Sequence, residues 1–360
     1  MTEIENILQK IVINNNSPSV QYILFDKDSI IKKYSCGLAD IVGNKNVNTK
    51  TTYNAFSVTK TFTALAILQL AEQKKIDIEQ SAKKYLSDFP YSTDITIRQL
   101  LSHSAGIPNP IPLNWIHLTS DHNSFNRNKF FKDIFNKNNK TKFQPNQNFA
   151  YSNLGYVLLG QLIENVSETS YEQYIKENII NRLGLKNEEL GFEIIDPILH
   201  AKGYHKKLSF TNLILGFFID KSKYMGKTEG KWKPFVNFYV NGISYGGLIG
   251  TPDAFVKYIQ DLLKSNNLLL SGDYKRILFT ENHTLNGKAT GMCLSWFSGQ
   301  LNGNKYFAHA GGGGGYYCEI RLYPDIGIGS VVFFNRTGMS DERFLDKMDK
   351  FYFAGDRRRN

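Results

Sequence analysis

Strand-like runs lie near both ends of this chain and helical patterns fill its middle, and this arrangement constrains the fold more than any other feature. Near the N-terminus, residues 20–25 and 29–34 form two such runs, joined by a polar turn. Near the C-terminus, four runs are spaced like an antiparallel meander: residues 291–297, 305–309, 316–323 and 329–334. We expect an α+β fold in which the terminal strands share one antiparallel sheet flanked by helices.

The helical patterns indicate a second part of the molecule. They are clearest over residues 57–73, 151–166 and 171–183. We expect residues 1–60 and 241–360 to form a sheet-containing lobe and residues 61–240 to form a mostly helical lobe. A chain of 360 residues with 41% hydrophobic residues has enough apolar material for both lobes. A cleft between the two lobes would be the natural place for an active site.

Charge and cysteine content narrow the classes of function. The formal charge is +10, but the lysines are spread along the whole chain without a nucleic-acid-binding motif. We therefore expect a solvated basic surface and no nucleic acid partner. The three cysteines, Cys36, Cys293 and Cys318, are too widely spaced for a metal site or a disulfide framework. They are expected to be buried thiols, and no metal or cofactor is expected.

The sequence shows no secretion or membrane signal. The first ten residues include Glu3 and Glu5 and lack the continuous apolar run of a secretory leader. The longest apolar patch, near residues 213–219, is too short for a membrane-spanning helix. As written, the chain is expected to be soluble and cytoplasmic, or secreted or periplasmic if a leader was removed before this numbering begins. Its oligomeric state is left open.

Ser57 and Lys60 stand three residues apart where the first long helical pattern begins. This spacing places both side chains on one face of a helix, and the helix N-terminus favours negative charge on the serine oxygen. A desolvated lysine can accept the hydroxyl proton. Two other segments match Ser-x-x-Lys, Ser29–Lys32 and Ser81–Lys84, but neither opens a long apolar helix. Ser57 is therefore the candidate nucleophile, and Lys60 is its candidate partner in proton transfer.

Two further segments carry polar groups suited to a hydrolase. Tyr151 and Asn153 lie at the start of another helix, where a phenol can relay a proton and an amide can orient a substrate carbonyl. His309, Gly311 and Gly312 end a strand-like run, and the small residues would let a substrate lie against the strand edge. Taken alone, the Tyr151–Asn153 segment is better explained as a polar cluster that caps the helix, and the His309 segment could be a glycine hinge with an ordinary histidine.

In this order, the three motifs resemble those of the serine β-lactamase, D-alanyl-D-alanine carboxypeptidase and related esterase superfamily, in its class C-like branch. The resemblance runs from about residue 53 to about residue 335. Further segments that fit this superfamily are Leu100–Pro108, Phe143–Pro145, Asn153–Tyr156, Gly246–Leu248 and Arg321–Pro324. The resemblance implies hydrolysis through an acyl-enzyme.

The resemblance also implies a role for each residue. Ser57 would attack a carbonyl, and Lys60 and Tyr151 would handle protons. The oxyanion hole would consist of the backbone N–H groups of Ser57 and Gly312. Which of Lys60 and Tyr151 is the general base stays open, because a coupled pair need not have a single base. The residues expected to hold the substrate are Asn153, His309 and Gly311.

The third motif departs from the pattern typical of members that hydrolyse β-lactams. Those members typically carry Lys-Thr-Gly, whereas this chain carries His309-Ala310-Gly311. A histidine carries less charge at neutral pH than a lysine. We therefore expect an ester or a peptide/amide substrate and inefficient β-lactam hydrolysis. His103 is expected to hold a turn, and Asn146 to adopt the left-handed turn for which relatives usually have glycine.

Two alternatives stay open. A protein with these residues could be acylated without turnover and act as a penicillin-binding sensor. Alternatively, the segment Gly242–Gly246 matches the nucleophile elbow of α/β-hydrolases, with Ser244 as the nucleophile and His309 following in the right order. That elbow requires a strand, a sharp turn and a helix within a parallel sheet, which the order of strand and helix patterns does not indicate.

Overall fold

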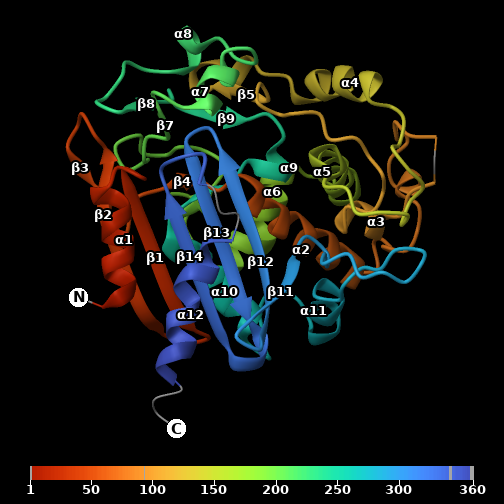
Figure 1. The fold of residues 1–360 in the computed structure, drawn as a ribbon. Coiled ribbons are helices and arrows are strands. Elements are labelled where there is room, and N and C mark those ends of the chain that lie inside the picture. Colours follow the sequence, from red (N-terminus) through yellow and green to blue (C-terminus); the bar gives the residue numbers. More distant parts are fainter. Residues whose placement is uncertain (1, 93, 340–342, 357–360) are drawn as a thin grey trace.

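The computed structural model describes residues 2–92, 94–339 and 343–356, and an antiparallel sheet of seven strands organises it (Figure 1). The strand order is β11-β12-β13-β14-β1-β2-β3. The bounds are Ser19–Asp26 (β1), Ile30–Asp40 (β2), Lys45–Asn46 (β3), Phe297–Leu301 (β11), Asn304–Gly313 (β12), Tyr316–Tyr323 (β13) and Ile328–Phe334 (β14). β1 pairs with β14, and Val20 lies opposite Phe334. The prediction that the terminal strands share one antiparallel sheet is therefore confirmed.

Helices cover both faces of this sheet (Figure 1). α1 (Glu3–Ile13) and α12 (Phe344–Asp356) pack on one face, and α10 (Pro252–Leu263) packs on the other. Successive side chains of a strand point to opposite faces of the sheet. A strand with an unbroken apolar run therefore supplies core residues to both faces. In β1, Tyr22 belongs to the hydrophobic cluster under α1 and α12, whereas Ile23 belongs to the cluster under α10. The sheet is thus the middle layer of three.

The middle of the chain forms a mostly helical part beside the sheet (Figure 1). Its central helix is α2 (Thr59–Glu72), which is buried from Thr59 to Ala71. Such a helix needs small or apolar residues all round, and this segment supplies threonine, alanine and leucine. The other helices are α3 (Ile97–Leu101), α4 (Arg127–Lys137), α5 (Asn153–Ser167), α6 (Tyr171–Ile175), α7 (Phe210–Leu215), α8 (Lys221–Tyr224), α9 (Ile243–Gly246) and α11 (Gly272–Leu278). The division into lobes at residues 60 and 240 stays a prediction.

Short strands connect these helices. β4 (Tyr53–Asn54) pairs with β10 (Ile249–Gly250), which pairs with β6 (Leu190–Gly191); β5 (Ile116–Leu118) pairs with β9 (Phe238–Val240); and β7 (Tyr204–Lys206) pairs with β8 (Trp232–Pro234). Each has only two or three residues, which is too few for a readable period in the sequence.

The strand expected at residues 291–297 is wrong. Sheet pairing begins only at Phe297, and the preceding residues form a tight loop. Gly291 and Ser295 have φ angles of 71° and 70°, which an extended strand does not allow. The backbone N–H of Ser295 donates to the carbonyl of Leu101, which ties the loop to the helical part.

The cysteines are free thiols, as expected, but only two of the three are buried. Cys293 and Cys318 are enclosed in the core, whereas Cys36 is half-buried. Cys36 lies in β2, near the edge of the sheet, and packs only partly against the hydrophobic cluster under α1 and α12.

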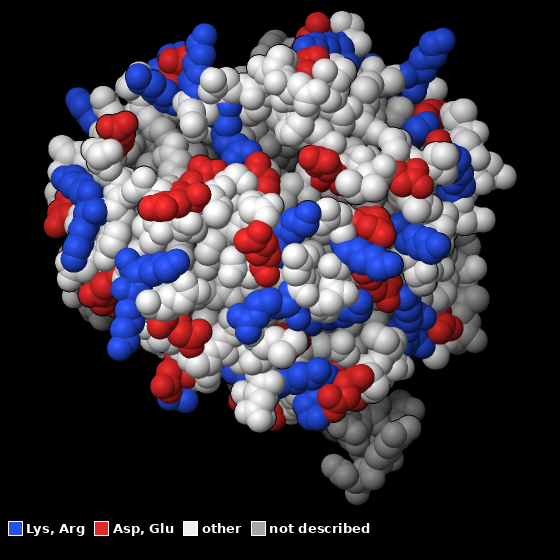
Figure 2. Space-filling view, turned by 180° about the vertical axis from the view of Figure 1, so that it is seen from behind, with Lys and Arg blue, Asp and Glu red and all other residues white. Residues whose placement is uncertain are grey.

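The surface carries charges of both signs. On the face seen in Figure 2, Lys and Arg are interspersed with Asp and Glu, as expected from the spread of lysines along the chain. Among the described residues, no helix is long and apolar enough to cross a lipid bilayer.

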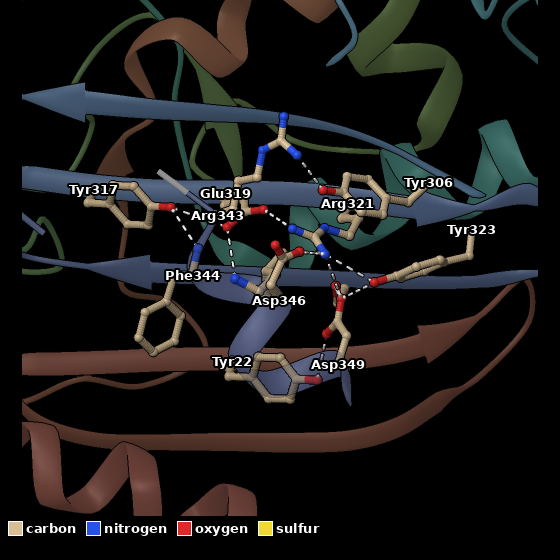
Figure 3. Close-up of polar contacts among 12 residues, drawn as sticks. Tyr22, Tyr306, Tyr317, Glu319, Arg321, Tyr323, Arg343, Phe344, Asp346 and Asp349 are labelled. Atoms are coloured by element: carbon tan, nitrogen blue, oxygen red, sulfur yellow. Dashed lines mark hydrogen bonds and ion pairs between the residues drawn. The ribbon is translucent and has the colours of Figure 1, made fainter. Parts of the chain in front are cut away.

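A buried ionic cluster fastens α12 to the sheet (Figure 3). The guanidinium of Arg321 in β13 is fully buried, 2.7 Å from a carboxylate oxygen of Glu319 and 2.5 Å from one of Asp346. Asp349, also in α12, lies 3.8 Å away. Burial raises the pKa of Glu319 to about 7, although the charge of Arg321 opposes this rise. The cluster is therefore held together by one central cation.

Replacing that cation is expected to destabilise the fold. Arg321→Met leaves the buried carboxyls of Glu319 and Asp349 without their positive partner, which should lower the free energy of unfolding by about 3–5 kcal/mol. The control is Arg276→Met, which breaks an ion pair with Asp273 whose side chains are about three-quarters exposed; the expected change is below ~1 kcal/mol. Chemical denaturation measures both. Equal losses of unfolding free energy in the two variants would show that the buried cluster stabilises the fold no more than an exposed ion pair does.

Candidate active site

Ser57 lies on a strained turn between β4 and α2. It is the middle residue of a single 3₁₀ turn, Phe56–Val58, that leads directly into α2. Phe56 has a φ angle of 44°, a left-handed conformation that a bulky residue rarely adopts. Its ring packs against the rings of Phe238 and Tyr316, with centroids 6.3 Å away in each case. This packing holds the turn and places the hydroxyl of Ser57 at the N-terminal end of α2.

The side chain of Lys60 is buried and contacts Ser57. Its Nζ lies 3.0 Å from Oγ of Ser57 and donates to the carbonyl oxygen of Tyr245, 2.9 Å away. The side chain is fully buried, and the described residues place no carboxylate within ion-pair distance of it. Burial alone holds the pKa of Lys60 well below its ordinary value. A lysine with a lowered pKa gives up its own proton more easily, and the neutral amine can then accept a proton from the serine.

Tyr151 and Asn153 flank the start of α5. The ring centroid of Tyr151 lies 4.9 Å from Nζ of Lys60, so the structure brings the Tyr151 segment next to the Ser57–Lys60 pair. Asn153 is the first residue of α5, and its backbone N–H donates to the side chain of Asn109. Its side-chain oxygen is buried and has no hydrogen-bond partner among the described residues. An unsatisfied acceptor of this kind costs free energy unless a further group supplies a donor.

His103 and Asn146 have the backbone conformations expected of turn residues, with φ angles of 55° and 61°. Nδ1 of His103 accepts the backbone N–H of Ser152, and its ring lies 4.3 Å from the ring of Tyr151. Burial keeps the pKa of His103 well below its ordinary value. These contacts tie the turn to the segment that carries Tyr151.

His309 presents a neutral ring. Its Nδ1 lies 2.5 Å from the carbonyl oxygen of Ser295, and since a carbonyl only accepts, Nδ1 carries the proton. Burial lowers the pKa of His309 to about 3, and the charge of Lys60 contributes. With the proton on Nδ1, Nε2 of the neutral imidazole is a hydrogen-bond acceptor. The third motif therefore offers an acceptor where a lysine would offer a positive charge.

Gly311 lets β12 approach the nucleophile. A Cβ atom at this position would lie 2.0 Å from the carbonyl oxygen of Ala55 and 3.1 Å from the backbone nitrogen of Ser57. Both are backbone atoms that cannot move aside, so only glycine fits here. The strand edge and the turn of Ser57 are thereby brought into contact.

A cavity of about 620 Å³ opens in front of these residues. It contains most of the predicted site, namely Ser57, Tyr151, His309, Gly311 and Gly312. Lys60 and Asn153 do not line it: Lys60 contacts Ser57 from the protein interior, and Asn153 is 6% exposed. Phe149 and Phe297 add apolar walls that the sequence did not indicate. The cavity continues along β12 and β13 to Tyr306, Tyr317 and Arg343.

Ser244 has a different environment. It lies in α9, is buried, and donates its hydroxyl hydrogen to the carbonyl oxygen of Tyr156, 2.8 Å away. It is absent from the lining of the cavity that contains Ser57. The antiparallel order of the large sheet also contradicts the α/β-hydrolase alternative, which requires a parallel sheet.

Known proteins resemble this chain over most of its length. Penicillin-binding protein 4* of Bacillus subtilis (strain 168) is 27% identical over 82% of the chain, which spans 63% of that protein's length. The structure of D-amino acid amidase from Ochrobactrum anthropi SV3 matches with a TM-score of 0.75 and 17% identity over 99% of this chain and 98% of that one. EstCE1, a hydrolase with promiscuous acyltransferase activity, matches with a TM-score of 0.74 and 18% identity over 96% and 95%. The two structures show a shared fold.

The family model described as Beta-lactamase matches residues 4–352, which is nearly the whole chain. This match agrees with the resemblance expected from the three motifs and with the three-layered architecture around the seven-stranded sheet. The protein belongs to the Beta-lactamase family.

Proposed function

We propose that this protein is a serine hydrolase that forms an acyl-enzyme on Ser57 with an ester or a peptide/amide substrate. One observation carries the proposal: Nζ of Lys60 lies 3.0 Å from Oγ of Ser57, and burial without a counter-ion lowers the pKa of this amine well below its ordinary value. Family membership and the amidase and esterase-like neighbours support hydrolysis in general.

The reaction would proceed in two stages. The Ser57 proton passes to the Lys60–Tyr151 pair as Oγ attacks the substrate carbonyl, and the pair then returns a proton to the departing alcohol or amine. The backbone N–H groups of Ser57 and Gly312 would stabilise the oxyanion. Water then attacks the acyl group and restores the hydroxyl of Ser57. The hydrogen bonds from the two N–H groups to the oxyanion stabilise it most strongly when the cavity excludes water.

The neutral ring of His309 affects which class of substrate the cavity favours. A carboxylate, such as that of penicillins and cephalosporins, gains little from a neutral acceptor, whereas a substrate N–H or O–H group can donate to it. This supports esters and amides over β-lactams with a free carboxylate.

A labelling experiment tests the proposed function. Incubation with an activated ester or a fluorophosphonate, followed by intact mass spectrometry, should show one adduct per chain that maps to Ser57. With the activated ester the adduct should decay as product appears. A carboxyl-ester adduct that persists for hours would instead favour the sensor alternative, and the absence of any adduct would contradict the proposal.

His309→Lys is expected to change substrate preference. The added charge should raise the hydrolysis of a chromogenic cephalosporin relative to that of a short ester by about tenfold. Because the pKa of His309 is about 3, the wild-type protein should show no titration of this residue between pH 5 and 9. Both enzymes are assayed on both substrates across that range. Efficient cephalosporin hydrolysis by the wild type, or an unchanged preference in the variant, would contradict the interpretation.

A further inference from the structure

An exposed apolar pair projects from the segment around α7. Leu208 is 91% exposed and Phe217 is 84% exposed, and Phe218 beside it is partly exposed. The segment itself is anchored: Leu215 is buried, and the side chain of Asn212 donates to the backbone carbonyl of Lys207. The two large side chains are therefore presented outward by a fixed segment. Large apolar side chains exposed together on one short segment, rather than scattered singly over the surface, indicate an interaction site.

The segment that carries this apolar pair is rich in positive charge. Residues 202–233 contain eight lysines but only Asp220 and Glu229 as acidic residues. Lys202 pairs with Glu229 and Asp40, and Lys223 pairs with Asp121. The remaining lysines have no ion pair within the described part of the chain: Lys206, Lys207, Lys221, Lys227, Lys231 and Lys233. An anionic partner would supply the charge that this segment lacks.

The cations also repel one another. Burial lowers the pKa of Lys206, and the neighbouring charges of Arg336 and Lys231 lower it further. Lys206 and Arg336 both lie over the ring of Trp232, at 6.0 and 5.8 Å from its centroid. Like charges held this close are costly unless counter-charge is nearby.

The chemistry of the two features selects one partner. Lysines alone would suit any polyanion, but a polyanion such as a nucleic acid offers nothing to an exposed leucine. A lipid bilayer with anionic headgroups accepts both, because apolar side chains enter the interface while lysines remain at headgroup level. We propose that Leu208, Phe217 and the surrounding lysines form a docking surface for an anionic lipid membrane.

This docking surface adjoins the cavity wall. The backbone N–H of Tyr204 in β7 donates to the carbonyl of Gly315, in the turn that follows β12. In Figure 1, α7, α8 and β8 lie together at the top of the molecule, far from α11 and the C-terminus. A protein docked through this surface would hold the end of β12, and with it the cavity, close to the bilayer. The inference does not depend on the reaction proposed for Ser57.

Vesicle sedimentation tests the proposal with the full chain. Wild-type protein should bind vesicles of phosphatidylcholine mixed with phosphatidylglycerol, bind phosphatidylcholine vesicles weakly, and release from the mixed vesicles as salt is raised. Leu208→Ser combined with Phe217→Ser should weaken binding by ~10-fold or more, because most of the inserted apolar area is lost. The matched control is Leu268→Ser combined with Leu285→Ser, at positions 55% and 76% exposed outside this segment. Circular dichroism checks that all variants fold.

Several outcomes would overturn the docking surface. One is equal binding to both kinds of vesicle, or no binding to either. Another is a control variant that loses as much binding as the Leu208/Phe217 variant. A third is a dimer in analytical ultracentrifugation that the Leu208/Phe217 variant abolishes in the absence of vesicle binding, since a second copy would then be the occupant. Binding to anionic vesicles that only the Leu208/Phe217 variant loses supports the proposal.

Discussion

Ser57→Ala is expected to lower kcat by ~10³-fold or more and to abolish covalent labelling. The hydroxyl of Ser57 faces both the buried amine of Lys60 and the cavity. Removing it leaves the cavity intact, so substrate should still bind. Steady-state kinetics on a short ester and intact mass spectrometry after probe treatment measure the two effects.

Ser244→Ala is the matched control. Ser244 is a buried serine outside the cavity, and its hydroxyl donates to the carbonyl of Tyr156. The change should therefore cost about 1 kcal/mol of stability and leave kcat and labelling nearly unchanged. A probe adduct on the peptide that contains Ser244, with none on the peptide that contains Ser57, would refute the assignment of the nucleophile.

Lys60 and Tyr151 are expected to act as one unit. Lys60→Met should lower kcat by ~10²–10⁴-fold, the range for loss of a positioned general base. Tyr151→Phe should have a comparable effect, and the double variant should be little worse than either single one, because groups that share a step are not additive. The ring of Tyr151 lies 4.9 Å from Nζ of Lys60, close enough for such sharing. Multiplicative losses would show that the two residues act in separate steps.

The pH profile and the stability of Lys60→Met separate chemistry from structure. Because burial lowers the pKa of Lys60, the neutral amine persists to lower pH than usual, and activity should rise with pH through that lowered pKa. Methionine fills similar space without a buried charge, so Lys60→Met should unfold at a temperature equal to or above that of the wild type. A large drop in the unfolding temperature would mean that the lost activity reflects a damaged fold.

Much of the fold could be predicted because long elements have strong patterns. The predicted strand 316–323 has the bounds of β13. The error at residues 291–297 arose because the segment is rich in apolar residues, as strands are, while the backbone turns at Gly291 and Ser295. α11 was missed because its seven residues offer too short a period.

The residues of the candidate site could be predicted from the sequence, but their hydrogen-bond partners and their burial could not. The sequence suggested Ser57 and Lys60, but it did not indicate that Nζ of Lys60 donates a hydrogen bond to the carbonyl oxygen of Tyr245. Nor did it indicate that Ser295 fixes the tautomer of His309, because that contact joins a loop to a strand through tertiary packing. Burial of these groups, which sets their protonation, exists only once distant segments have come together.

The pairing of β1 with β14 affects how the protein is made. β1 is synthesised first, but its neighbour on one side is the last strand of the sheet, so that edge stays unpaired until almost the whole chain has emerged from the ribosome. Gly311 and His309, which adjoin Ser57, lie in the same late segment. Contacts so distant along the chain form slowly. Ser57 would therefore leave the ribosome before the strand that carries Gly312, its proposed partner in the oxyanion hole, and a fragment that stops before β12 would lack that part of the proposed site.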